Sequence, residues 1–80
     1  MQMTIESKFN IGDIVYVADL YHDFYANRKP YVVKDVLVDI NSRRIHIQYE
    51  VEQDGLVCYS PEDWTFATYE ECVQWCKERN

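Results

Sequence analysis

The chain has 80 residues, of which 48% are hydrophobic and only two each are glycine and proline, a composition that excludes a disordered chain and favours one small domain with a dense core. Its net charge of -6 argues against direct binding to nucleic acid, because duplex binding needs Lys and Arg side chains that displace counterions from the phosphates. No apolar run approaches the roughly 20 residues that span a bilayer, and the N-terminus lacks the pattern of a secretion signal, so we expect no membrane partner and a cytoplasmic location.

Residues 1–7 read as a lead-in, and the fold is expected to open at Gly12-Asp13. This dipeptide favours a turn, because glycine tolerates positive φ and the aspartate side chain can bond its own backbone. The strand predicted over residues 14–18 carries apolar side chains on both faces. Such a strand is expected to lie between the core and a covering element.

Residues 19–30 show no hydrophobic period, which predicts a connection of about a dozen residues. A loop of that length in so small a domain is more often functional than accidental. It combines aromatic and charged side chains, as protein interfaces do, and some of the rings could instead serve only to cover the core. The candidate binding residues are Tyr21, His22, Phe24, Tyr25, Arg28 and Lys29.

A strand with an irregular period is predicted over residues 31–40. Its alternation from Val36 onward is out of step with residues 31–33, so we expect a bulge near Lys34. A turn at residues 41–43 then ends the strand.

The next strand has the clearest pattern in the chain. The odd-numbered residues from Ile45 to Val51 are apolar and the even-numbered ones are polar, which predicts a half-buried antiparallel strand. Asp54-Gly55 then predicts a two-residue type I′ hairpin, because both positions accept positive φ. A strand over residues 56–59, a short turn and a brief strand over residues 64–66 complete the sheet.

One helix is predicted over residues 68–79. Thr68 as the N-cap and Glu71 three residues later form a capping box. An apolar stripe that starts at Tyr69 should dock on the sheet, because a three-turn helix is marginal on its own. The expected contact residues are Trp64, Phe66 and Trp75.

Three motifs carry a resemblance to a known family. They are G-D-x-V-Y at residues 12–16, I-x-Y-x-V at residues 47–51 and F-x-T-x-E-E at residues 66–71. The opening is similar to that of many SH3-like barrels, and together the motifs resemble small uncharacterised SH3-like barrel proteins of Gram-positive bacteria and their phages. That family has no assigned activity.

The resemblance implies a mainly β fold with one C-terminal α-helix. The fold would be a small SH3-like barrel of about five antiparallel strands in a single domain over residues 1–80, with a lead-in at 1–7, the barrel at 8–66 and the helix at 68–79. Recognition of proline-rich peptides is not implied, because Trp64 and Trp75 lie in the tail of the chain and not at a loop edge.

Catalysis is disfavoured by the inventory of reactive residues. Cys58 and His46 lie on neighbouring predicted strands, but no positive charge near Cys58 would activate its thiol. The three cysteines are interpreted as small buried hydrophobic residues, because a zinc site needs four ligands and no histidine lies near Cys72 and Cys76. We therefore expect no enzyme, no cofactor and no metal.

The leading hypothesis is a non-enzymatic protein-binding module that acts through the 19–30 loop. An alternative is a small acidic inhibitor, a nucleic-acid mimic like some anti-CRISPR proteins, that occupies the basic site of a host nucleic-acid-binding protein. A third is a homodimer through open strand edges, for which the two-sided first strand would serve. The acidity could also serve only solubility. The acidic face of the mimic would consist of Asp19, Asp23, Asp35, Asp39, Glu50, Glu52, Asp54, Glu62 and Asp63.

Overall fold

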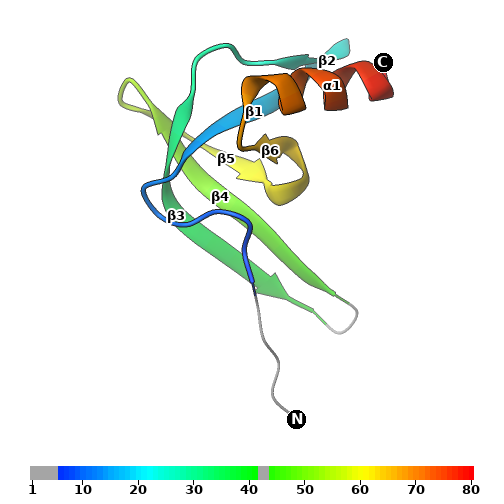
Figure 1. Cartoon of the computed structure of the whole chain (residues 1–80). Helices are drawn as coiled ribbons and strands as arrows, with labels where there is room; N and C mark the ends of the chain where they lie inside the picture. Colours follow the sequence, from blue (N-terminus) through cyan, green and yellow to red (C-terminus); the bar gives the residue numbers. More distant parts are fainter. Residues whose placement is uncertain (1–5, 42–43) are drawn as a thin grey trace.

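Antiparallel strands form one curled sheet, and a single helix packs at one end of it (Figure 1). The computed structural model describes residues 6–41 and 44–80, so the predicted lead-in at 1–7 and the predicted turn at 41–43 lie partly outside the described residues. The prediction of a mainly β fold with one C-terminal helix is confirmed. In chain order the elements are β1 (Ile14–Tyr21), β2 (Asp23–Ala26), β3 (Tyr31–Ile40), β4 (Ile45–Gln53), β5 (Leu56–Pro61), the 3₁₀-helix η1 (Glu62–Trp64), β6 (Thr65–Phe66) and α1 (Tyr69–Arg79).

The sheet has the strand order β2-β1-β3-β4-β5, and β6 pairs separately with β1. Among the described residues β5 and β6 do not pair, so the sheet curls without closing into a barrel. The chain leaves β5 at Pro61, which has no backbone N–H to donate, and η1 then carries it to β1. Only Thr65 and Phe66 remain to form the last strand.

β1 lies between two apolar clusters, as its two-sided pattern predicts. Val15 and Val17 are buried on one face, and Ala18 is buried on the other. The first cluster contains Val15, Val17, Val33, Tyr49 and Val51. The second joins the sheet to the helix and contains Ala18, Cys72 and Cys76, with Tyr16, Phe24, Ala26, Trp64, Phe66 and Trp75 packed around them.

The prediction of an irregular loop over residues 19–30 is wrong for residues 19–26, and only residues 27–30 connect β2 to β3 without regular structure. β1 continues to Tyr21, and β2 returns antiparallel to it, with Asp19 opposite Tyr25. The turn is made at His22, whose φ of 62° lies in the left-handed region. The alternation was invisible in the sequence because this hairpin extends beyond the core, so that Leu20 and Tyr21 are 55% and 73% exposed.

The predicted bulge in β3 and the inward pattern of β4 are both confirmed. Val33 pairs with Val51 and Asp35 with Glu50, so Lys34 is the extra residue between them. Burial along β4 is graded, since Tyr49 and Val51 are fully buried whereas Ile45 and Ile47 are half-buried. The cause is visible in Figure 1, where β3 and β4 extend past β5 as a two-stranded arm.

Both predicted local signals at the end of the chain are confirmed. Asp54 and Gly55 have φ of 51° and 83°, the values of a type I′ hairpin. Thr68 caps α1, because its side chain accepts a hydrogen bond of 3.2 Å from the backbone N–H of Glu71.

A buried phenol connects the sheet to the segment before β1. The Tyr49 hydroxyl donates to Oε2 of Glu62 at 2.6 Å and accepts from the backbone N–H of Phe9 at 3.2 Å. The same Glu62 oxygen accepts from the backbone N–H of Lys8 at 3.1 Å. Burial, followed by the hydrogen bond to Glu62, raises the pKa of Tyr49 to about 12.

We expect Tyr49→Phe to lower the free energy of unfolding by about 1–2 kcal/mol, because it leaves the Glu62 carboxylate short of a donor. Tyr59→Phe is the matched control, since the Tyr59 hydroxyl also donates to a carboxylate, Glu50, but Tyr59 is 58% exposed. Its effect should stay within about 0.5 kcal/mol. Urea unfolding followed by circular dichroism measures both, and equal losses would contradict this account.

Stability should fall in alkaline solution. Burial raises the pKa of Cys72 from 9.0 and that of Tyr49 from 10.0, each to about 12. A group whose pKa is raised by folding stabilises the folded state at pH values below its unfolded pKa. This stabilisation is lost as the pH rises toward the folded pKa, so the loss should begin near pH 9 and end near pH 12. In the Tyr49→Phe variant, the loss of stability that starts near pH 9 and comes from Cys72 should persist. The additional loss above pH 10, which comes from Tyr49, should disappear. Thermal melting across this range measures the difference, and an unchanged profile above pH 10 would refute it.

Candidate functional site

The structure brings together three of the six predicted loop residues: Phe24, Tyr25 and Arg28 line one hollow of about 330 Å³ against α1. The other three lie outside it. Tyr21 and His22 lie at the tip of the β1–β2 hairpin, with their rings 4.6 Å apart. Tyr25 is 47% exposed, and the Arg28 side chain is also exposed. Lys29 forms an ion pair with Asp54 in the β4–β5 turn.

Phe24 is a structural residue. Its ring centroid lies 5.1 Å from that of Trp64 and 4.9 Å from that of Trp75, in edge-to-face contacts. Its backbone is also held, because the Asn80 side chain accepts from the Phe24 N–H and donates to the Phe24 carbonyl, both at 2.8 Å. Phe24 therefore helps to cover the second cluster, whereas Tyr21 and Tyr25 remain on the surface.

A different surface is brought together by β3, β4 and β5. The residues that alternate with the buried Tyr49 and Val51 point away from the core, and we call this surface the outer face. The helix packs on β1, β2 and β6, and over the described residues no element covers the outer face (Figure 1). The outer face consists of Val32, Asp35, Leu37, Asp39, His46, Gln48, Glu50, Glu52, Val57, Tyr59 and Pro61.

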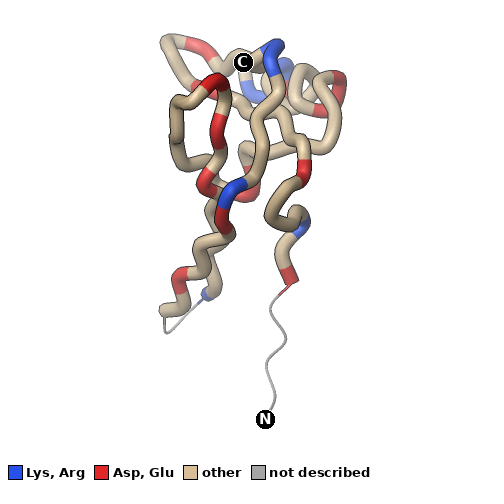
Figure 2. The backbone as a smooth tube through the Cα atoms, turned by 90° about the vertical axis from the view of Figure 1, so that its left-hand side faces the viewer, with Lys and Arg blue, Asp and Glu red and all other residues tan. Residues whose placement is uncertain are grey.

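The outer face is acidic. Asp35 on β3 is directly opposite Glu50 on β4, and Glu52 lies two residues further along the same strand. Like charges in directly opposed positions of a sheet are destabilising. The ion pair that offsets this charge joins Lys34 to Glu52 at 3.2 Å. Figure 2 shows how acidic positions outnumber the basic ones along the chain.

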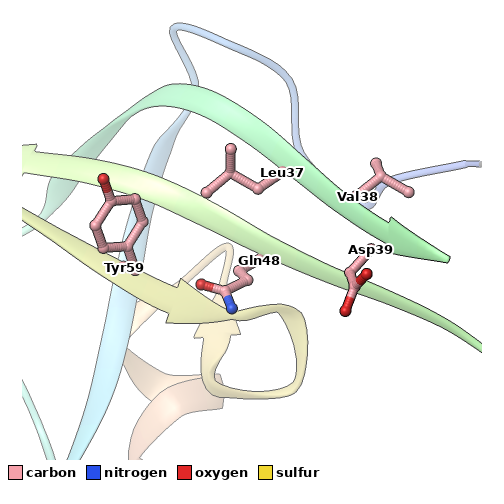
Figure 3. A pocket seen from close by; sticks show the side chains of 5 residues that line it. All are labelled: Leu37, Val38, Asp39, Gln48 and Tyr59. Carbon is pink, nitrogen blue, oxygen red and sulfur yellow. The ribbon is translucent and has the colours of Figure 1, made fainter. Parts of the chain in front are cut away.

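A shallow hollow of about 350 Å³ lies on this face (Figure 3). Leu37 and Tyr59 give it apolar walls, and Gln48 and Asp39 give it polar ones; Val38 also lines it. At one side the Tyr59 hydroxyl donates to Oε1 of Glu50 at 3.3 Å. Exposed leucine and tyrosine side chains beside carboxylates suit a ligand with an aliphatic stem and a cationic end, such as a lysine or arginine side chain.

The other predicted acidic residues lie elsewhere. Asp19 accepts a hydrogen bond of 2.6 Å from the Asn27 side chain, and Glu62 is committed to Tyr49. The nine residues therefore do not form one acidic face. Those outside the outer face are Asp19, Asp23, Asp54, Glu62 and Asp63.

The structure separates the residues weighed for catalysis. His46 is opposite Asp39, whereas Cys58 is opposite Val51. The prediction that all three cysteines are buried is wrong for Cys58, which is exposed because β5 is the last strand of the sheet path. In the part of the chain that the structure describes, no group of three or more His, Cys, Asp or Glu side chains is placed to hold a metal ion. Over the same residues, no helix has the length and apolarity that crossing a membrane requires.

No family model, curated protein or solved structure matches the chain. The choice of a candidate site therefore rests on the geometry of this chain alone. Sequence reasoning named the acidic members of the outer face but missed Leu37, Gln48 and Tyr59. The available signal was the alternation of β4, whose polar side already contained Gln48 and Glu50.

Alanine substitutions in the β1–β2 hairpin should affect stability differently at Phe24, which covers the second cluster, and at the surface residues Tyr21 and Tyr25. We expect Phe24→Ala to lower the free energy of unfolding by about 2 kcal/mol or more, because it removes contacts with two tryptophan rings. Tyr21→Ala and Tyr25→Ala should each change it by less than about 1 kcal/mol, because Tyr21 is 73% and Tyr25 47% exposed. Denaturant unfolding measures all three, and a loss at Tyr25 as large as at Phe24 would contradict the assignment.

Proposed function

We propose that this chain is a non-enzymatic protein-binding module that docks a basic segment of another protein on its outer face. The observation that carries the proposal is the direct opposition of Asp35 and Glu50, with Glu52 nearby. It replaces the loop-based version of the hypothesis, because residues 19–26 belong to a hairpin whose Phe24 serves the core.

The energetic argument concerns the cost of these carboxylates. A pair of like charges across two strands lowers the stability of the fold by about 0.2–1 kcal/mol. This is a considerable cost for a small domain, whose total stability is low. Lys34 relieves Glu52 but leaves the opposed pair uncompensated. A cationic side chain of a partner would turn this repulsion into attraction, and the neighbouring apolar walls would add contact area.

The acidic inhibitor stays as the second candidate, now on a smaller surface. Four of the nine predicted residues lie on the outer face: Asp35, Asp39, Glu50 and Glu52. If the basic partner is itself a nucleic-acid-binding protein, these carboxylates would take the places of phosphates. Both candidates predict weaker binding as salt rises, and the identity of the partner separates them.

We infer further that the curled sheet is an open relative of the SH3-like barrel. The antiparallel meander from β3 to β5, the opening at Gly12-Asp13 and the small closing helix support this interpretation. A cytoplasmic location is supported by the odd number of cysteines, because secreted domains of this size usually pair theirs.

The test is a double substitution, Asp35→Asn with Glu50→Gln, which removes two charges but keeps oxygen acceptors for Val36 and Tyr59. We expect it to raise the free energy of unfolding by about 0.2–1 kcal/mol while weakening the partner's binding about tenfold. The partner is captured from an extract of the source cells, and its affinity for purified variants is then measured by calorimetry at low and high salt.

The matched control removes the same charge elsewhere, at the exposed Asp23 and Asp63, by Asp23→Asn with Asp63→Asn. This control should bind nearly as the parent protein does. Equal binding by the parent and the outer-face variant, or binding that is insensitive to salt, would reject the proposal.

A further inference from the structure

β2 and β5, the two end strands of the sheet path, differ in whether the backbone groups on their outer edges have hydrogen-bond partners. At the β2 end, the Asn80 side chain bonds both the N–H and the carbonyl of Phe24, so that edge is occupied at Phe24. At the β5 end, no strand among the described residues pairs on the side away from β4. The open edge of β5 is therefore the place where another strand can add.

The hairpin geometry decides which backbone groups of β5 point outward. In a two-residue hairpin the flanking residues, here Gln53 and Leu56, exchange both hydrogen bonds, and bonded and non-bonded pairs then alternate. Cys58 thus bonds to β4, while the N–H and carbonyl groups of Val57 and Tyr59 point away from it. The open edge offers two donors and two acceptors.

Up to Pro61, where β5 ends, this edge lacks the devices that usually prevent strand pairing. Residues 56–60 contain no charged residue, proline or glycine, and no bulge interrupts their pairing with β4. Large apolar side chains are exposed on both sides of the strand: Leu56 is 74% exposed, Val57 53% and Tyr59 58%. An exposed edge of this kind is a preferred site for association.

We propose that two copies of this chain pair antiparallel through β5, with Val57 of each copy opposite Tyr59 of the other. The register follows from the backbone groups. Pairing Val57 with Tyr59 satisfies all four outward groups of each chain. A shift in one direction sets Val57 opposite Pro61, which has no N–H, and a shift in the other sets Tyr59 opposite Gly55 in the turn.

Side chains and charges agree with this register. Each Val57 meets a tyrosine of the other copy, a favourable pair of β-branched and aromatic side chains. The acidic residues of the two β4 strands would lie three strand spacings apart, about 14 Å, which exceeds the Debye length of about 8 Å at physiological salt. Added salt should therefore leave the pair intact or strengthen it, opposite to its effect on a basic partner bound to the outer face.

The first test removes the outward donor. Val57→Pro deletes an N–H that β4 does not use, and by symmetry it removes two of the four hydrogen bonds between the copies. We expect the dissociation constant of the pair to rise at least about tenfold, whereas Val57→Thr, which keeps the N–H and the branched shape, should change it little. Sedimentation equilibrium from micromolar to millimolar protein measures both, with thermal melting to verify that each variant folds.

The second test reports the register through Cys58. The two-fold axis passes between the Cys58 residues of the two copies, a non-bonded pair with Cα atoms about 4.5 Å apart, within the disulfide range of about 4.4–6.8 Å. Diamide, which accepts the two electrons and two protons released as the S–S bond forms, should cross-link the parent protein. In the variant Leu56→Cys with Cys58→Ser, each new thiol faces Ser60 of the other copy, so cross-linking should be at least about tenfold slower although Leu56 is 74% exposed.

A parent protein that stays monomeric at millimolar concentration would overturn the proposal. So would pairing that survives Val57→Pro unchanged, or equal cross-linking rates for the two thiol positions. Val57 and Tyr59 also belong to the outer face, so the binding of a basic partner is tested separately, through Asp35 and Glu50 with Val57 unchanged.

Discussion

The architecture depends on a strand that is used on every side. β1 pairs with β3 at its start, with β6 in its middle and with β2 in its second half, and it buries side chains on both faces. A chain of this size cannot build one thick core, so two small clusters share the same strand. The curl of β3 to β5 closes the first cluster around Tyr49, and α1 closes the second around Cys72. Loss of β1 would open both clusters at once.

This use of the helix decides which surfaces remain available. Because α1 is needed over β1, β2 and β6, the outer face of β3 to β5 has no cover among the described elements and must be polar enough to meet water. Polarity alone does not require two carboxylates in opposition, since alternating signs would be more favourable. The charge on this face is thus the feature that packing does not explain, and we connect it with a partner.

The sequence predicted well where one residue controls local geometry. Thr68 fixed the start of the helix, Asp54-Gly55 the hairpin, and the break in period at Lys34 the bulge. Prediction from the sequence failed where the structure of a segment or the exposure of a residue depends on its position in the folded sheet. The hairpin over residues 19–26 is hidden because its outer half has no core to face, and the exposure of Cys58 depends on β5 being the last strand of its sheet path. Four acidic residues of the candidate face followed from composition, but their neighbours Leu37 and Tyr59 could be found only once strand register was known.

The Asn80 side chain has a consequence beyond the fold. Its amide carries the same donor and acceptor as a peptide unit, so on Phe24 it acts as a single link of an added strand. If two copies join through β5, as proposed above, the same edge is used in both of them, and the edge of β2 carries the Asn80 link at Phe24. Such a contact uses the same surface of each copy, so strand addition at β5 would close at two chains and this edge would not become the start of a fibre.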